Sequence, residues 1–212
     1  MLLNRLEFLL MNNPIRAAFQ RHVETRVFLR MGGPVQGAKA LEIGCGRGVG
    51  VELILARFGA GSVDAFDLDP RMIALARHRL RGRQAQVRLW VGDAAAITAL
   101  DAAYDAVFDF GIIHHVPNWR AALAETYRVL KPGGSLYAEE PVGKFLNHPL
   151  MHRLCAHPVA DRFTGSDFRR ALEAAGFSVS AERNLWPMLS WFVATKPSSA
   201  ESPDQRTSRT KL

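Results

Sequence analysis

Apolar and polar positions follow two different periods along the centre of this chain. Five short segments are continuously apolar or alternate with a period of two, as strands do, and they are residues 40–43, 62–67, 87–91, 104–113 and 135–140. Between them, apolar residues recur every three or four positions, as on one face of a helix. Strands that alternate with helices predict an α/β fold with a doubly wound, mostly parallel sheet and helices on both faces.

The last two apolar segments predict a different end to this sheet. Residues 177–181 and 189–194 read as strands joined through residues 184–188, and a helix that starts near Thr164 precedes them. Strands this close in sequence pair antiparallel, because a parallel pair needs a long crossover. We therefore expect a seven-stranded, Rossmann-like sheet that ends in an antiparallel hairpin.

The flanking segments set the expected domain limits. Asn13-Pro14 is typical of a helix start, Gly32-Gly33 of a helix end, and one apolar helix face is predicted in between, at Ile15, Phe19, Val23 and Val27. We expect residues 1–33 to form an N-terminal helical arm and residues 34–196 to form the main domain. Residues 197–212 are polar and charged, so we predict a disordered tail.

Three spaced glycines follow the first predicted strand directly. Gly44, Gly46 and Gly48 separate this strand from a helical segment over residues 51–57. A strand, a glycine turn and a helix start form a nucleotide-binding unit, because glycine lets the backbone turn tightly and lets a ligand approach closely. Glu42 lies just before the first glycine, where its carboxylate suits a cationic ligand better than a pyrophosphate.

Acidic residues close the next strands. Asp67 ends the second strand, about 20 residues after the glycines, where a carboxylate can accept hydrogen bonds from both ribose hydroxyls. Asp69 is predicted to cap a helix that begins at Pro70 and buries Met72, Leu75, Ala76 and Leu80. Asp93 follows the third strand, and Asp109 lies within the fourth.

Two further motifs follow in the chain. His114-His115-Val116-Pro117 stands at the end of the fourth strand, and Leu130-Lys-Pro-Gly-Gly134 precedes the fifth. Three further features belong with these motifs: Glu42-Ile-Gly-Cys-Gly-Arg-Gly48, Asp67 and Asp93. Together they resemble the class I S-adenosylmethionine-dependent methyltransferases, in particular the small-molecule group of ubiquinone and menaquinone methyltransferases. The resemblance covers residues 39–140 most clearly.

The resemblance implies methyl transfer from S-adenosyl-L-methionine to a small-molecule or lipid acceptor. It implies that Asp93 holds the adenine amino group and that the backbone N–H of Ala94 meets the adenine ring. The full set of cofactor-binding residues that we expect is Glu42, Gly44, Cys45, Gly46, Gly48, Asp67, Leu68, Asp93, Ala94 and Asp109. His114 and His115 are the candidate catalytic residues, because a histidine accepts a proton near neutral pH.

Other functions were weighed against this one. The net charge of +7 gathers in an acid-free run with Arg71, Arg77, Arg79, Arg81, Arg83 and Arg88, which could bind RNA or an anionic membrane. We interpret this run as a solvated helix face, because no aromatic side chains interleave with it. An RNA methyltransferase and a non-catalytic cofactor-binding protein remain the alternatives, while Glu42 argues against a nicotinamide oxidoreductase.

The remaining expectations concern metal sites, the cellular compartment and the pocket for the methyl acceptor. Cys45 and Cys155 provide neither a disulfide framework nor a metal motif, and no metal site is predicted. No apolar run approaches the roughly 20 residues of a membrane span, and we expect a cytoplasmic protein. Residues 141–164 mix apolar side chains with His148, His152 and His157, which suits an acceptor pocket. The oligomeric state is not predicted.

Overall fold

The computed structural model describes residues 13–141, 163–185 and 189–198 of the 212-residue chain. The helices are α2 (Pro14–Phe19), the π-helical turn η1 (Gln20–Glu24), α3 (Thr25–Gly32), α4 (Val49–Ala56), α5 (Pro70–Arg79), the 3-10 turn η2 (Ile113–His115), α6 (Trp119–Val129) and α8 (Gly165–Ala174). The strands are β1 (Lys39–Ile43), β2 (Ser62–Asp67), β3 (Val87–Val91), β4 (Tyr104–Phe110), β5 (Leu130–Pro141), β6 (Ser178–Leu185) and β7 (Leu189–Thr195).

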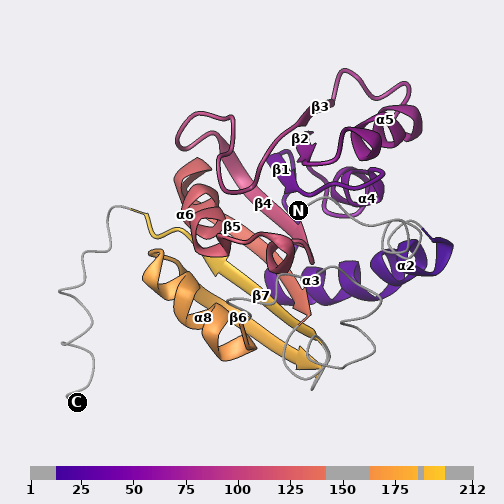
Figure 1. The fold of residues 1–212 in the computed structure, drawn as a ribbon. Coiled ribbons are helices and arrows are strands. Elements are labelled where there is room, and N and C mark those ends of the chain that lie inside the picture. The colour runs from indigo at the N-terminus through magenta and orange to yellow at the C-terminus, as the bar shows by residue number, and fades with distance from the viewer. Residues whose placement is uncertain (1–12, 142–162, 186–188, 199–212) are drawn as a thin grey trace, which may run out of the picture.

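The strands form one seven-stranded sheet in the order β3-β2-β1-β4-β5-β7-β6 (Figure 1). The first five strands pair in parallel, whereas β7 runs antiparallel to both β5 and β6. The predicted doubly wound sheet with a terminal antiparallel hairpin is confirmed. The strand order reverses between β1 and β4, and such a switch point opens a crevice beyond the carboxyl ends of the strands.

Two hydrophobic cores lie on opposite faces of this sheet. Helices α3, α4 and α5 cover one face and α6 and α8 the other (Figure 1). Consecutive residues of β4 alternate between the two cores: Ala106 and Phe108 pack under α3 and α4, and Val107 packs under α6. Because the central strands are buried on both faces, the sheet is a rigid base for the residues at its carboxyl edge.

The N-terminal arm corrects one prediction. Its helix begins at Pro14 with Asn13 as the cap, as expected, but Ile15 and Val23 are exposed. The π-helical turn inserts an extra residue and rotates the following face, so that Gln20, Glu24 and Phe28 point inward instead. The predicted apolar face was therefore wrong at Ile15 and Val23 and right at Val27, which is buried in the core.

Smaller differences concern two other elements. The fourth strand ends at Phe110 and not at Ile113, because Gly111 has φ +81° and turns the chain. In α5 the predicted Leu75 is exposed, and Ile73 is buried in its place. The predicted tail falls almost wholly, and the insertion mainly, outside the described residues. None of the helices in the described part of the chain has the length and hydrophobicity needed to cross a bilayer.

Candidate cofactor and active site

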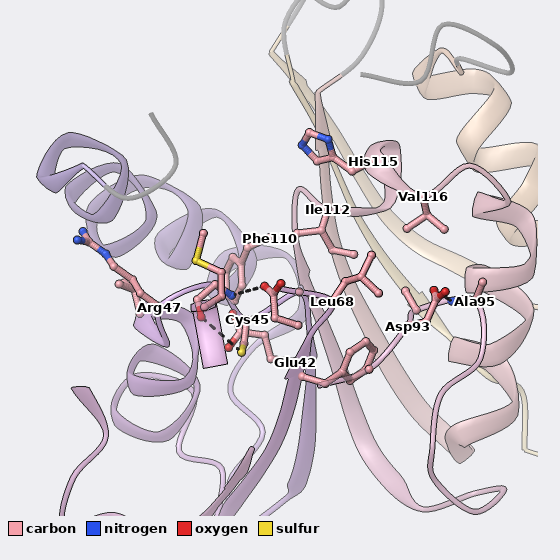
Figure 2. A pocket seen from close by; sticks show the side chains of 18 of the residues that line it. Glu42, Cys45, Arg47, Leu68, Asp93, Ala95, Phe110, Ile112, His115 and Val116 are labelled. Carbon is pink, nitrogen blue, oxygen red and sulfur yellow. Dashed lines mark hydrogen bonds between the residues drawn. The ribbon is translucent and has the colours of Figure 1, made fainter. Parts of the chain in front are cut away.

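A cavity of about 370 Å³ opens at the carboxyl edge of β1, β2 and β4. It lies at the point where the strand order reverses. The glycine turn after β1, the ends of β2 and β3, the loop after β4 and the N-terminal arm all contribute to its wall (Figure 2). Five segments far apart in the sequence therefore meet at one site.

Gly44 and Gly46 of the glycine turn line the cavity, whereas the predicted Gly48 does not line it and faces Ala76 and Leu80. Gly44, Gly46 and Gly48 have φ values of +65°, +52° and +84°, which side chains other than glycine rarely adopt. A Cβ atom at Gly44 would lie 2.6 Å from Ile112, whereas one at Gly46 would meet nothing within 4 Å. Gly44 is thus required by packing against the loop after β4, and Gly46 leaves open space for a ligand.

Glu42 is the most unusual acid of the cavity wall. Its side chain is 2% exposed, and its Oε2 atom has no hydrogen-bond partner among the described residues. Burial, followed by the nearby Asp67 and Asp109, raises the pKa of the Glu42 carboxyl well above its usual range. Burial likewise raises the pKa of the neighbouring Cys45 thiol, so this cysteine is an unreactive wall residue.

Asp67 is held by the turn that it faces. Its Oδ2 atom accepts a hydrogen bond from the Gly46 N–H at 2.9 Å, and its Oδ1 atom accepts one from the Asp69 N–H at 2.9 Å. These bonds fix the carboxylate at the end of β2, at the cavity wall beside Leu68. Burial nevertheless raises the pKa of Asp67, because the two bonds only partly offset desolvation.

Asp93 and Ala94 form the far side of the cavity. In Figure 2, Asp93 and Arg47 lie at opposite sides of the cavity. Asp93 is exposed, and its Oδ1 atom accepts a hydrogen bond from the Ala95 N–H at 2.9 Å. Ala94 is buried next to it. The short turn after β3 therefore presents a carboxylate to this end of the cavity.

Asp109 lies away from the cavity wall. It is fully buried, and its Oδ1 atom accepts a hydrogen bond from the Ile112 N–H at 2.8 Å. Burial and the adjacent Glu140 raise the pKa of Asp109 well above its usual range. Burial also raises the pKa of Glu140 to about 7. The structure thus places Asp109 behind the loop after β4, where it shapes that loop and does not line the cavity.

The two histidines occupy different positions. The His114 Nδ1 atom lies 2.8 Å from the Glu140 Oε2 atom, and the His114 side chain is 7% exposed. His115 lines the cavity and lies at its upper rim in Figure 2. The two rings lie 4.0 Å apart. Of the predicted pair, only His115 faces the space in which a reacting group can lie.

The N-terminal arm adds wall residues that the sequence analysis did not single out. Arg16, Ala17 and Gln20 line the cavity. The Arg16 guanidinium forms an ion pair with the fully buried Glu24, and its Nη2 atom donates a hydrogen bond to the Phe110 carbonyl at 3.1 Å. The π-helical turn brings Gln20 and Glu24 inward, so a helical period alone could not predict them.

The charges and shape of this cavity fit a nucleoside-containing cation. Open space above Gly46 admits a ligand close to the backbone, and Asp67 and Asp93 present carboxylates at separate points for hydroxyl or amino donors. The unpaired Glu42 oxygen offers a partner for positive charge. S-adenosyl-L-methionine has all of these features, namely a purine, a ribose and a cationic sulfonium centre.

Known proteins with similar sequences support this assignment. Residues 40–134 match the family described as a methyltransferase domain. The chain is 38% identical over 118 residues to the malonyl-[acyl-carrier protein] O-methyltransferase of Serratia marcescens, a match that covers 56% of this chain and 44% of that protein. It is 38% identical over 106 residues to a ubiquinone biosynthesis O-methyltransferase of Xanthomonas oryzae, covering 48% and 42%. The chain spans less than half the length of these two relatives.

Solved structures agree with the fold. The methyltransferase in a complex with the Haloferax volcanii Trm112 methyltransferase activator superposes with a TM-score of 0.74 at 20% identity, covering 92% of this chain and 99% of that one. The matched residues 40–134 contain the glycine turn, Asp67, Asp93 and both histidines, so the sequence match and the cavity coincide. Over residues 40–134 the chain is therefore similar to class I methyltransferases, whose cofactor is S-adenosyl-L-methionine.

Proposed function

We propose that this protein transfers the methyl group of S-adenosyl-L-methionine to a small-molecule or lipid acceptor. The observation that carries the proposal is the single cavity wall that joins the glycine turn, Asp67 and Asp93 to His115. The cofactor supplies an electrophilic methyl group on its sulfonium sulfur. The protein then has to hold that group beside the acceptor and remove a proton where the acceptor carries one.

The proposed roles follow the geometry of the wall. Asp67 binds the ribose hydroxyls, because its carboxylate is already oriented by two backbone N–H groups. Asp93 and Ala94 hold the adenine, and Gly46 admits the amino-acid part beside Glu42. These residues bind and orient the cofactor and take no part in bond making. The cytoplasm is the compartment proposed for the reaction.

His115 is the proposed proton acceptor. It lies on the wall formed by the loop after β4, whereas His114 is directed toward Glu140. We expect His115→Ala to lower turnover of an acceptor with an acidic hydrogen by about 10²- to 10⁴-fold while cofactor affinity stays within twofold. His114→Ala is the matched variant, with a smaller loss. Full turnover in His115→Ala would assign proton removal to another group or to water.

A transfer assay with labelled cofactor tests the function as a whole. The full-length protein is incubated with S-adenosyl-L-methionine carrying a labelled methyl group and with separate pools of metabolites, lipids and RNA. Label in a small molecule or lipid supports the proposal. Label only in RNA would establish the alternative acceptor, and cofactor binding without transfer to any pool would favour a non-catalytic protein.

A further inference from the structure

Three buried acids of the described residues, Glu24, Glu42 and Asp109, have a carboxyl oxygen without a hydrogen-bond partner, and of these three only Glu42 lines the cavity. Glu24 has the Arg16 guanidinium, Glu139 has the Trp191 N–H, and Glu140 has two backbone N–H groups and His114. Glu42 has a backbone hydrogen bond with Val51, and its Oε2 atom has no partner within the part of the chain that the structure describes. A buried carboxylate without a cation or a full set of donors is strongly disfavoured, so the free protein holds Glu42 in its protonated form.

The charged and titratable groups around Glu42 strengthen this conclusion. Those packed against it or sharing its cavity wall come from six segments of the described structure. They are Arg16, Cys45, Arg47, Asp93 and His115, together with Asp67 and Asp109, the two aspartates that influence the pKa of Glu42. The two aspartates oppose ionisation of Glu42, and Arg16 favours it less strongly. The Arg16 guanidinium is already paired with Glu24, so it leaves the Glu42 charge uncompensated.

A cationic ligand changes this balance. Positive charge in the cavity favours the ionised carboxylate at Glu42 and offsets the repulsion from Asp67. We propose that binding of S-adenosyl-L-methionine releases the proton of Glu42 to solvent, so that the cavity accepts the cofactor as a cation in exchange for a proton. This inference rests on the proposed function because it requires that cofactor as the ligand.

The proposed exchange determines the direction in which cofactor affinity changes with pH. The neutral carboxyl dissociates into a carboxylate and a proton, and the proton passes to the buffer. Below the pKa of Glu42 in the free protein, cofactor affinity therefore rises with pH, by up to about tenfold per pH unit. Above that pKa the carboxylate is already formed, and this contribution to the pH dependence ends.

Calorimetry in buffers of different ionisation enthalpy measures the released proton directly. We expect release of up to about one proton per cofactor molecule for the wild-type protein, and release close to zero for Glu42→Gln, which keeps the side-chain shape. Asp64→Asn is the matched control, because Asp64 is a buried acid in the amino-terminal half of β2 that contacts Tyr104 and Lys39 and does not line the cavity. It should release protons as the wild type does.

A neutral ligand completes the test. 5′-Methylthioadenosine carries the nucleoside and the sulfur without the sulfonium or ammonium charge, and its binding should release no proton. Equal proton release in wild type and Glu42→Gln, with both folded by circular dichroism, would overturn the inference while leaving the methyltransferase function intact. Absence of cofactor binding to the wild-type protein would overturn both.

Discussion

The acidic side chains at the carboxyl edge of the sheet differ between its two halves in whether they face the cavity. At β1, β2 and β3, Glu42, Asp67 and Asp93 all line the cavity. The Glu42 Oε2 atom has no partner among the described residues, and each Asp67 oxygen accepts one backbone N–H. At β4 and β5, Asp109 and Glu140 are fully buried and do not line it. The acids of the first half face the cavity, and the acids of the second half accept hydrogen bonds from the loop after β4.

The loop after β4 shows what the second half achieves. Backbone N–H groups of Ile112, Ile113 and His114 donate to the Asp109 and Glu140 carboxylates. These three hydrogen bonds to buried carboxyl oxygens hold the loop against the ends of β4 and β5. Ile112 then packs against Gly44 and joins the two halves. Acids of the same type thus line the cavity in one half and hold a loop in the other.

The largest expected effect breaks the contact between the halves. Gly44→Val forces a side chain into a φ of +65° and against Ile112, at a combined cost of about 2–6 kcal/mol. We expect cofactor binding to be lost by calorimetry. Gly82→Val has the same kind of strain, with φ +83°, but meets no neighbour within 4 Å and does not line the cavity. It should lose stability and keep affinity. Equal affinity in both variants would contradict the role of Gly44.

The second prediction concerns the binding half. Asp67→Ala should weaken cofactor binding by about 1.5–3 kcal/mol, the scale of a hydrogen bond to a charged group. Asp69→Ala is the control, because it removes the cap of α5 two residues away. This variant should lower the free energy of unfolding by about 1 kcal/mol and leave the affinity for the cofactor within twofold of the wild type. Wild-type affinity in a folded Asp67→Ala protein would exclude the ribose assignment.

The third prediction concerns the loop-holding half. The pKa of Glu140 is raised to about 7 in the folded protein from 4.5, so the folded state binds more protons between these values. The free energy of unfolding of the wild type should therefore fall by about 1–3 kcal/mol as pH rises from 5 to 8. Glu140→Gln should reduce this slope in urea titrations, and an unchanged slope would refute the assignment.

A companion variant separates charge from hydrogen bonding at the same position. Glu140→Ala removes the acceptor for the Ile113 and His114 N–H groups and should lower the free energy of unfolding by about 1–3 kcal/mol beyond Glu140→Gln at pH 7. Cofactor affinity should change less than in Asp67→Ala. If Glu140→Ala weakened binding more than Asp67→Ala, then the division between the two halves would be wrong.

The smallest effect is expected outside both halves. Arg81 and Arg83 follow α5 on the surface. Among the described residues, no carboxylate oxygen lies within 4.0 Å of a guanidinium nitrogen of either arginine. The double change to alanine should alter stability by less than about 0.5 kcal/mol and leave cofactor affinity unchanged. A large loss of methyl transfer to lipid or RNA, measured at several salt concentrations, would instead make the basic run a functional surface.

The sequence by itself determined the order and type of the main elements and the place of the cofactor cavity. Short apolar strands, Asp69-Pro70 and the glycines act over neighbouring residues, and their effects are local. Because the carboxyl ends of parallel strands meet at one edge, residues as far apart as Gly46, Asp67 and Asp93 could be predicted to meet there. All three do line the cavity.

Only the tertiary structure decided which acids and histidines face the ligand. Asp109 and His114 carry the same chemical groups as Asp67 and His115, yet neither lines the cavity, because both interact with Glu140 of β5. The π-helical turn likewise brings Gln20 to the cavity wall against the helical period of its segment. Side-chain direction depends on backbone turns and on partners far away in the sequence, and neither is encoded in a local pattern.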